Sequence, residues 1–348
     1  MPHGPFTYCS RALTTRCRSP ARACLSHAGC GQDRGDPSRP GCPGPTDRVL
    51  PELVGVRQRA LPEDAGHQRH GVAAHHADVR VREHRPGQPD LHGRAAAGVF
   101  DGIDLDWEFP ATEARAGNHY GPQDTANFTA LLAEFRSQLD ALGGAHRSLT
   151  AAVPAGPDAI VNLQLSQLGT YLDLANVMSY DMHGAWETAG PTNFNAPLYD
   201  SPASPSAGGK MTADDAVKAY LAGGFPAGKL TLGVPFYARG WTGVPAGDTF
   251  GLYQPVTGPT AAFPFSQQEG VAMYKELLAA GKLTNPHYDP VSTSTWVHDG
   301  TNFFSVETPL SLAGKRRYIK DNGLAGVMMY SLESDDASAT LLKAATGL

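Results

Sequence analysis

The segment DGIDLDWE at positions 101–108 holds the residues best suited to chemistry. Acidic residues alternate with apolar ones in it: Asp104, Asp106 and Glu108 against Ile103, Leu105 and Trp107. Side chains two residues apart in a β-strand point to the same side of the sheet. We therefore expect three carboxyl groups to share one face, while the apolar face packs against helices.

Three carboxyl groups on one strand face disfavour each other's ionisation, and burial adds to the effect. At least one of them should stay protonated near neutral pH, as a general acid requires. Two other interpretations are a solvated strand edge and an oxygen-ligand site for Mg²⁺ or Ca²⁺. A complete apolar opposite face argues against the solvated edge.

The elements that would position these groups follow from residue 99 onward, where strand and helix patterns alternate. Strands are expected at 99–107, 149–153, 174–180, 229–235 and 325–330, and helices at 125–142, 160–171, 213–222, 309–321 and 336–345. Asp124 and Thr212 are well placed to cap two of the helices. The alternation predicts an α/β fold with a parallel sheet. Residues 238–306 exceed a simple crossover and predict an inserted subdomain with a short helix at 268–280.

Composition narrows the possible partners. The formal net charge of −6 argues against nucleic acid or an anionic membrane as partner, and it is compatible with a neutral sugar polymer. The sequence has no apolar run of the ~18 residues that a membrane span needs. Its 348 residues exceed the roughly 250 of a (β/α)₈ barrel.

Residues 1–97 differ from the rest of the chain. They lack lysine, isoleucine, tryptophan and asparagine, and they hold all five cysteines. We expect a disordered or non-native segment here, and our hypothesis is a shifted reading frame that rejoins the true frame near residue 98. No apolar core of a secretion signal is recognisable in it.

The acidic segment resembles the DxxDxDxE signature of glycoside hydrolase family 18, carried here by Asp101, Asp104, Asp106 and Glu108. Residues 178–181 (MSYD) resemble the family's M-x-Y-D motif, and residues 233–241 (GVPFYARGW) resemble its seventh-strand segment. Tyr330 stands where the family usually has a tryptophan at the end of strand eight. The resemblance covers about residues 98–348.

The resemblance implies a (β/α)₈ TIM barrel lineage with a small α+β insertion domain at 238–306. Residues 98–348 form the catalytic portion, and the first three strands are not recognisable. Five strands alone cannot close a barrel.

The implied activity is that of a chitinase, hydrolysing β-1,4-linked N-acetylglucosamine polymers by substrate-assisted retention. Glu108 would be the acid, Asp106 and Asp104 its charged partners, and Tyr180 and Asp181 the groups that hold the substrate's acetamido group. Further residues are expected to bind substrate or, for Asp101, to support the strand: Asp101, Trp107, Met178, Tyr237, Arg239, Trp241 and Tyr330. Trp241 and Trp186 have packing as an equal alternative.

The resemblance also implies a secreted monomer that acts on chitin or chito-oligosaccharides without a metal or organic cofactor. Two alternatives stay open. One is an endo-β-N-acetylglucosaminidase acting on glycoprotein glycans. The other is a catalytically silent chitin-binding lectin, against which the presence of Glu108 counts.

Overall fold

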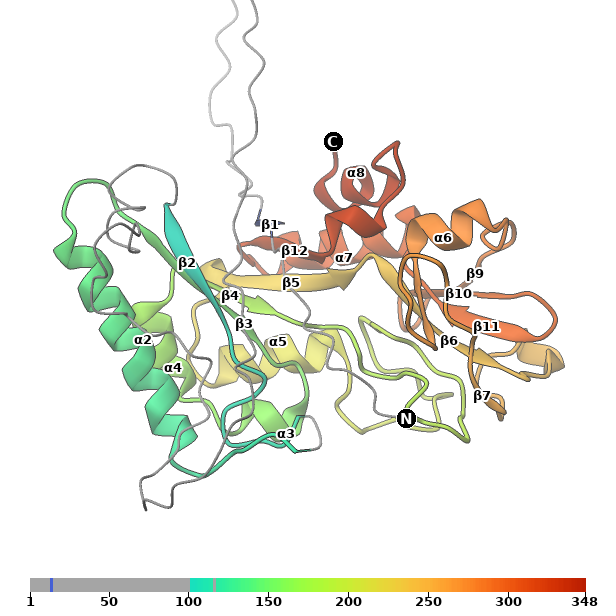
Figure 1. Ribbon diagram of the computed structural model, residues 1–348, viewed down its shortest axis with the longest axis horizontal. Coiled ribbons are helices and arrows are strands. Elements are labelled where there is room, and N and C mark those ends of the chain that lie inside the picture. Colours follow the sequence, from blue (N-terminus) through green and yellow to red (C-terminus); the bar gives the residue numbers. More distant parts are fainter. Residues whose placement is uncertain (1–12, 15–100, 115–116) are drawn as a thin grey trace, which may run out of the picture.

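The computed structural model describes residues 13–14, 101–114 and 117–348 (Figure 1). Our expectation of a disordered or non-native segment at residues 1–97 concerns a region that, apart from two residues, lies outside the described part of the chain.

A parallel sheet forms the centre of the described structure. It contains, in spatial order, β2 (Gly102–Asp106), β3 (Ser148–Val153), β4 (Leu174–Val177), β5 (Leu230–Pro235) and β12 (Gly326–Tyr330). The two-residue β1 (Leu13–Thr14) pairs antiparallel with β12. All five predicted strands are present and pair in parallel, but the strand expected at 174–180 ends at Val177, so Met178 and Tyr180 follow it in a loop. Over the described residues the sheet is open, with β2 at one edge and β1 at the other.

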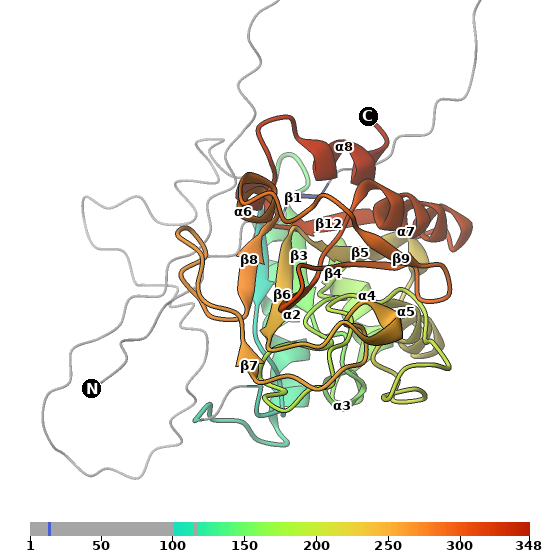
Figure 2. The same cartoon turned by 90° about the vertical axis from the view of Figure 1, so that its right-hand side faces the viewer.

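Helices cover one face of this sheet (Figures 1 and 2). They are α2 (Asp124–Ala141), α3 (Pro157–Ile160), α4 (Leu165–Tyr171) and α5 (Ala213–Ala222), followed near the carboxyl terminus by α7 (Pro309–Asp321) and α8 (Thr340–Thr346). Phe128, Leu132, Phe135 and Leu139 of α2 recur at three- and four-residue steps and are all buried against the strands. This apolar stripe is what fixes α2 beneath the acidic strand.

The predicted helix caps have different outcomes. The Thr212 hydroxyl accepts from the Asp215 amide at 3.1 Å, so Thr212 caps α5 as predicted. The prediction for Asp124 was wrong, because Gln123 occupies the cap position of α2. The Asp124 carboxylate accepts from the Gly121 amide at 2.9 Å and so stabilises the turn that precedes the helix.

A second, antiparallel sheet lies between β5 and α7 in the sequence. Its order is β7 (Gly258–Pro259), β6 (Tyr237–Thr242), β11 (Asn302–Ser305), β10 (Ser294–His298) and β9 (His287–Asp289), and β8 (Val271–Met273) also pairs with β6. The helix α6 (Tyr274–Ala279) follows β8. Only Phe236 separates β5 from β6, so the second sheet begins where a parallel strand ends. Figure 2 shows β6, β7 and β8 beside the parallel sheet.

Three helix predictions need correction. The range 268–280 is a strand followed by a helix, because residues 271–273 pair with residues 237–239 of β6. The range 160–171 is divided into α3 and α4. The last helix begins at Thr340 and not at Asp336. The Asp336 carboxylate instead accepts a hydrogen bond from the Thr340 amide at 2.9 Å.

No helix in the described part of the chain is long and apolar enough to cross a membrane.

Candidate active site

The acidic strand β2 has the two faces that its alternation predicts. The Asp104 carboxylate accepts hydrogen bonds from Thr150 of β3 and, at 3.3 Å, from the Asn176 amide of β4. Leu105 is buried in the core between sheet and helices. Trp107 lies edge-on to Phe128 of α2, with ring centroids 5.8 Å apart. The carboxyl groups therefore occupy the sheet face opposite the helices.

Asp104 resists ionisation in this position. Desolvation by the surrounding protein atoms raises its pKa to about 6, and the negative charge of Asp106 adds to the rise. The hydrogen bonds from Thr150 and Asn176 act in the opposite sense but only in part offset it. The group therefore titrates in the mildly acidic range, where it can share or pass a proton.

Glu108 follows β2 at its carboxyl end. The residue is exposed to solvent, as a group that meets a substrate must be. Its pKa is raised to about 7, first by partial desolvation and then by the negative charges of Asp106 and Asp181. A large fraction of Glu108 is therefore protonated at neutral pH, which is the state a general acid needs.

Three tyrosine rings from different elements meet beside these carboxyl groups. Tyr180 follows β4, Tyr237 begins β6 and Tyr330 ends β12, and each pair of ring centroids is 6.1 Å apart. Tyr180 fits against β5 because Gly233 lacks a side chain: a Cβ there would lie 3.0 Å from the Tyr180 ring. Burial raises the pKa of Tyr180 well above 10, so its hydroxyl remains a donor throughout the neutral range.

Asp181 is held by charge and by backbone geometry. Its carboxylate accepts from the Tyr237 hydroxyl at 2.6 Å and from Arg239 Nε at 2.8 Å, and a second Arg239 nitrogen lies 2.7 Å from its other oxygen. Its φ of +59° lies in the left-handed region, which costs a non-glycine residue on the order of 1–3 kcal/mol and needs support from surrounding contacts. Asn195 supplies such a contact, since its Oδ1 accepts the Asp181 amide at 2.8 Å.

Direct contacts or charge effects thus link most of the predicted site residues, and Asp106 acts on both Asp104 and Glu108. The linked residues are Asp104, Glu108, Tyr180, Asp181, Tyr237, Arg239 and Tyr330. Met178 directly follows β4, where its amide donates to the Val153 carbonyl at 2.9 Å. Glu108, Tyr180 and Tyr330 lie at or just after the carboxyl ends of parallel strands, the edge where barrel enzymes carry their chemistry, and Tyr237 and Arg239 reach the site from the start of β6.

Three predicted substrate contacts are placed elsewhere. Trp241 has 0% of its surface exposed and packs on Phe303 inside the second sheet, so the packing alternative is correct for it. Trp107 packs against the helices, as described above. Asp101 precedes the amino end of β2, and the length of that strand places it roughly 16 Å from Asp106, the last residue of β2.

Trp186 differs from Trp241 because 54% of its surface is exposed. The Arg239 guanidinium carbon lies 4.9 Å from its ring centroid, a cation–π geometry. Trp186 is therefore available for stacking on a ligand next to the Asp181–Arg239 pair.

Sequence reasoning missed the polar partners of the acidic groups: Thr150, Asn176 and Asn195. Each lies far from its partner in the sequence, and no local pattern marks it. The described residues contain no group of three or more His, Cys, Asp or Glu side chains arranged to hold a metal ion.

Known proteins resemble this chain in sequence and fold over most of its length. The family described as "Glycosyl hydrolases family 18" matches residues 89–335. Chitinase A1 of Niallia circulans is 34% identical over 249 residues, which are 68% of this chain and 35% of that protein. The catalytic domain of psychrophilic chitinase B from Arthrobacter TAD20 has a TM-score of 0.65 at 38% identity, covering 71% of this chain and 56% of that one.

A further solved structure adds a ligand class. YKL-39, studied in the presence of chito-oligosaccharides, has a TM-score of 0.64 at 25% identity, covering 72% of this chain and 69% of that one. The chain spans only about a third to a half of the first two relatives named. The predicted fold is confirmed, and since the family match extends over more than half of its residues, this chain belongs to glycosyl hydrolases family 18.

Proposed function

We propose that the chain is a chitinase that cleaves β-1,4 linkages between N-acetylglucosamine units. The observation that carries the proposal is the raised pKa of Glu108, at the carboxyl end of β2 and under the charges of Asp106 and Asp181. This environment suits an acid that must donate a proton to a glycosidic oxygen near neutral pH.

The proposed reaction uses the substrate's own acetamido group as nucleophile. Glu108 protonates the glycosidic oxygen while the acetamido oxygen attacks the anomeric carbon. The bond between that carbon and the glycosidic oxygen breaks, the departing sugar leaves with the proton as its hydroxyl group, and a cyclic oxazolinium intermediate remains. Asp106 faces the acetamido N–H and stabilises the positive charge. Asp104 shares a hydrogen bond with Asp106. Water then opens the intermediate, activated by the Glu108 carboxylate.

Tyr180 and Asp181 complete the proposed site by holding the acetamido group in the attacking position. The high pKa of the Tyr180 hydroxyl supports a role as donor to the acetyl oxygen. The exposed Trp186 and the tyrosine Tyr330 would contact sugar rings. As part of the proposal, the chain acts outside the cell, as a monomer, on chitin or chito-oligosaccharides.

The test compares three oligosaccharides with the purified full chain: chitotriose, cellotriose and a fully deacetylated chitosan trimer. Only chitotriose carries the attacking acetamido oxygen, so only chitotriose should be cleaved, as measured by mass spectrometry of the products. Comparable cleavage of all three would overturn the substrate-assisted mechanism. Binding of chitotriose without cleavage would indicate a lectin, and release of intact glycans from a glycoprotein would indicate the endo-β-N-acetylglucosaminidase.

A further inference from the structure

Asn195 lies in the long connection between β4 and α5 and is 1% exposed. Its side chain joins two segments of the site: Oδ1 accepts the Asp181 amide at 2.8 Å, and Nδ2 donates to the Tyr237 carbonyl at 3.4 Å. Its backbone is fixed as well, because its carbonyl accepts the Met182 amide at 2.9 Å and its amide donates to the Ser305 hydroxyl at 2.9 Å. Asn195 therefore contacts the loop after β4 and, through Tyr237 and Ser305, the strands β6 and β11 of the second sheet.

The two segments joined by the Asn195 side chain are also those that supply the contacts among Asp181, Tyr237 and Arg239. Asp181 supplies the carboxylate, and β6 supplies Tyr237 and Arg239, which hold that carboxylate. The Asn195 carboxamide thus connects the backbone amide of Asp181 to the backbone carbonyl of Tyr237. Because Asp181 has a left-handed φ, its amide cannot join a regular strand ladder, and the Asn195 oxygen serves as its acceptor.

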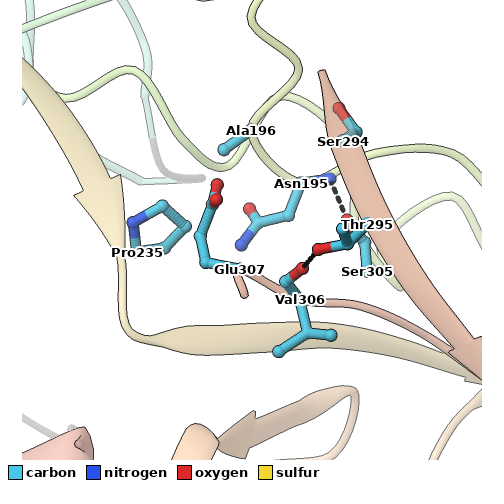
Figure 3. A pocket seen from close by; sticks show the side chains of 8 residues that line it. All are labelled: Asn195, Ala196, Pro235, Ser294, Thr295, Ser305, Val306 and Glu307. Carbon is cyan, nitrogen blue, oxygen red and sulfur yellow. Dashed lines mark hydrogen bonds between the residues drawn. The ribbon is translucent and has the colours of Figure 1, made fainter. Parts of the chain in front are cut away.

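The surroundings of Asn195 keep its own position fixed. It borders a small cavity with Pro235, Ser305 and Glu307, toward which the Asn195 and Glu307 side chains both turn (Figure 3). The buried Lys315 of α7 contacts Glu307 and donates to the carbonyl of Ala196 at 2.6 Å. The residue that follows Asn195 is therefore tied to α7, while Asn195 itself is tied to the second sheet.

We infer that Asn195 is a positioning residue of the active site, whose carboxamide holds Asp181 in register with Tyr237 and Arg239 so that the Asp181 carboxylate faces the reacting sugar. The inference rests on the proposed function for its kinetic consequence. Its structural consequence, the placement of Asp181, is independent of that function.

The experiment compares Asn195→Ala with Asn193→Ala. Asn193 is in the same connection and 4% exposed, and its Nδ2 donates to Ser204 and Ser206, away from Asp181. Both changes remove a buried carboxamide, so a general loss of stability would affect both variants alike. Asn195→Asp keeps an acceptor for the Asp181 amide but loses the donor to Tyr237, and it separates the two contacts.

For chitotriose cleavage we expect Asn195→Ala to lower kcat by about 10²-fold with little change in KM, because a displacement of about 1 Å at a reacting group has an effect of that size. The alkaline limb of its pH profile should move to lower pH. Glu108 faces Asp106 on β2 and Asp181 and Tyr180 after β4, and loss of the fixed Asp181 charge removes one cause of its raised pKa. Asn193→Ala should retain the wild-type profile, and Asn195→Asp should recover part of kcat.

Crystal structures of the wild type and Asn195→Ala decide the matter even if the wild type cleaves nothing, an outcome that would overturn only the proposed function. The expected result is an Asp181 carboxylate displaced from Arg239. An intact Asp181–Arg239 pair in Asn195→Ala, or a wild-type pH profile and kcat in an active enzyme, would overturn the inference.

Discussion

Arg239 holds Asp181 through both of its carboxylate oxygens, at 2.8 Å from Nε and 2.7 Å from a terminal nitrogen. The guanidinium plane also lies near two aromatic rings, with its central carbon 4.9 Å from the Trp186 centroid and 5.3 Å from that of Tyr237. A planar fork that pairs with a carboxylate and stacks on rings is a role that lysine cannot fill.

Arg239→Lys should therefore lower kcat/KM for chitotriose by about tenfold or more, because the ammonium keeps the charge but not the two-point contact. Arg317→Lys is the matched control, since Arg317 forms only an exposed pair with Asp321 on α7. Initial rates over a range of substrate concentration measure the effect. Equal values for the two variants would show that the two-point contact has no part in turnover.

Glu108→Gln should reduce hydrolysis by about 10²–10⁴-fold while oligosaccharide binding persists, because the amide keeps the shape of the acid but cannot donate its proton. Glu113→Gln, an exposed change in the loop after β2, should leave the rate within twofold of wild type. Calorimetry with chitotriose separates binding from turnover. Wild-type turnover by Glu108→Gln would show that Glu108 is not the general acid.

The rate of hydrolysis should depend on pH through the protonation of Glu108. The active form of Glu108 is protonated, so kcat/KM should fall as pH rises through about 7, the pKa of that group in the free enzyme. Asp106 is one cause of the raised pKa, so in Asp106→Asn the alkaline limb of the residual activity should move to lower pH.

Asp101→Asn is the control for this shift because Asp101 lies beyond the opposite end of β2. Its pH profile should match that of the wild type. If Asp106→Asn and Asp101→Asn had the same profile, Asp106 would not act on Glu108 as the charges indicate.

The buried pair of Lys315 and Glu307 should contribute to stability as a unit, since both side chains are almost fully buried. Lys315→Met leaves the Glu307 carboxylate without its partner and should lower the free energy of unfolding by about 3–5 kcal/mol. Lys320→Met, on the exposed end of α7, should change it by less than about 0.5 kcal/mol. Denaturant unfolding followed by fluorescence measures both. Adding Glu307→Gln to Lys315→Met should restore part of the lost free energy of unfolding. If Lys315→Met and Lys320→Met lowered it equally, the buried pair would not contribute to stability as a unit.

The sequence predicts which segments form the parallel strands, and it predicts the acidic face of β2, because both follow from local periodicity. Alternation over 103–108 is enough to place Leu105 in the core and Asp104 opposite it. The same rule places Trp107 against helix α2, on the face away from the carboxyl groups.

Contacts that close over long sequence separations could not be predicted in this way. Trp241 is in an alternating strand whose burial depends on Phe303, 62 positions later, and the pairing of β8 with β6 replaces the predicted first turns of a helix. Asn195 is an ordinary loop asparagine in the sequence. Only the folded chain shows that its carboxamide joins Asp181 to Tyr237.

The direct continuation of β5 into β6 has a consequence for engineering this chain. Because Tyr237 and Arg239 stand in the first three positions of the second sheet, that sheet is not a detachable module that merely deepens a groove. A shortened variant that joins β5 directly to α7 would lose the second sheet and, with it, the positive charge of Arg239 that pairs with Asp181. A graft of this sheet onto another protein would bring the Arg239 charge with it, and the host would need a carboxylate of its own to pair with it.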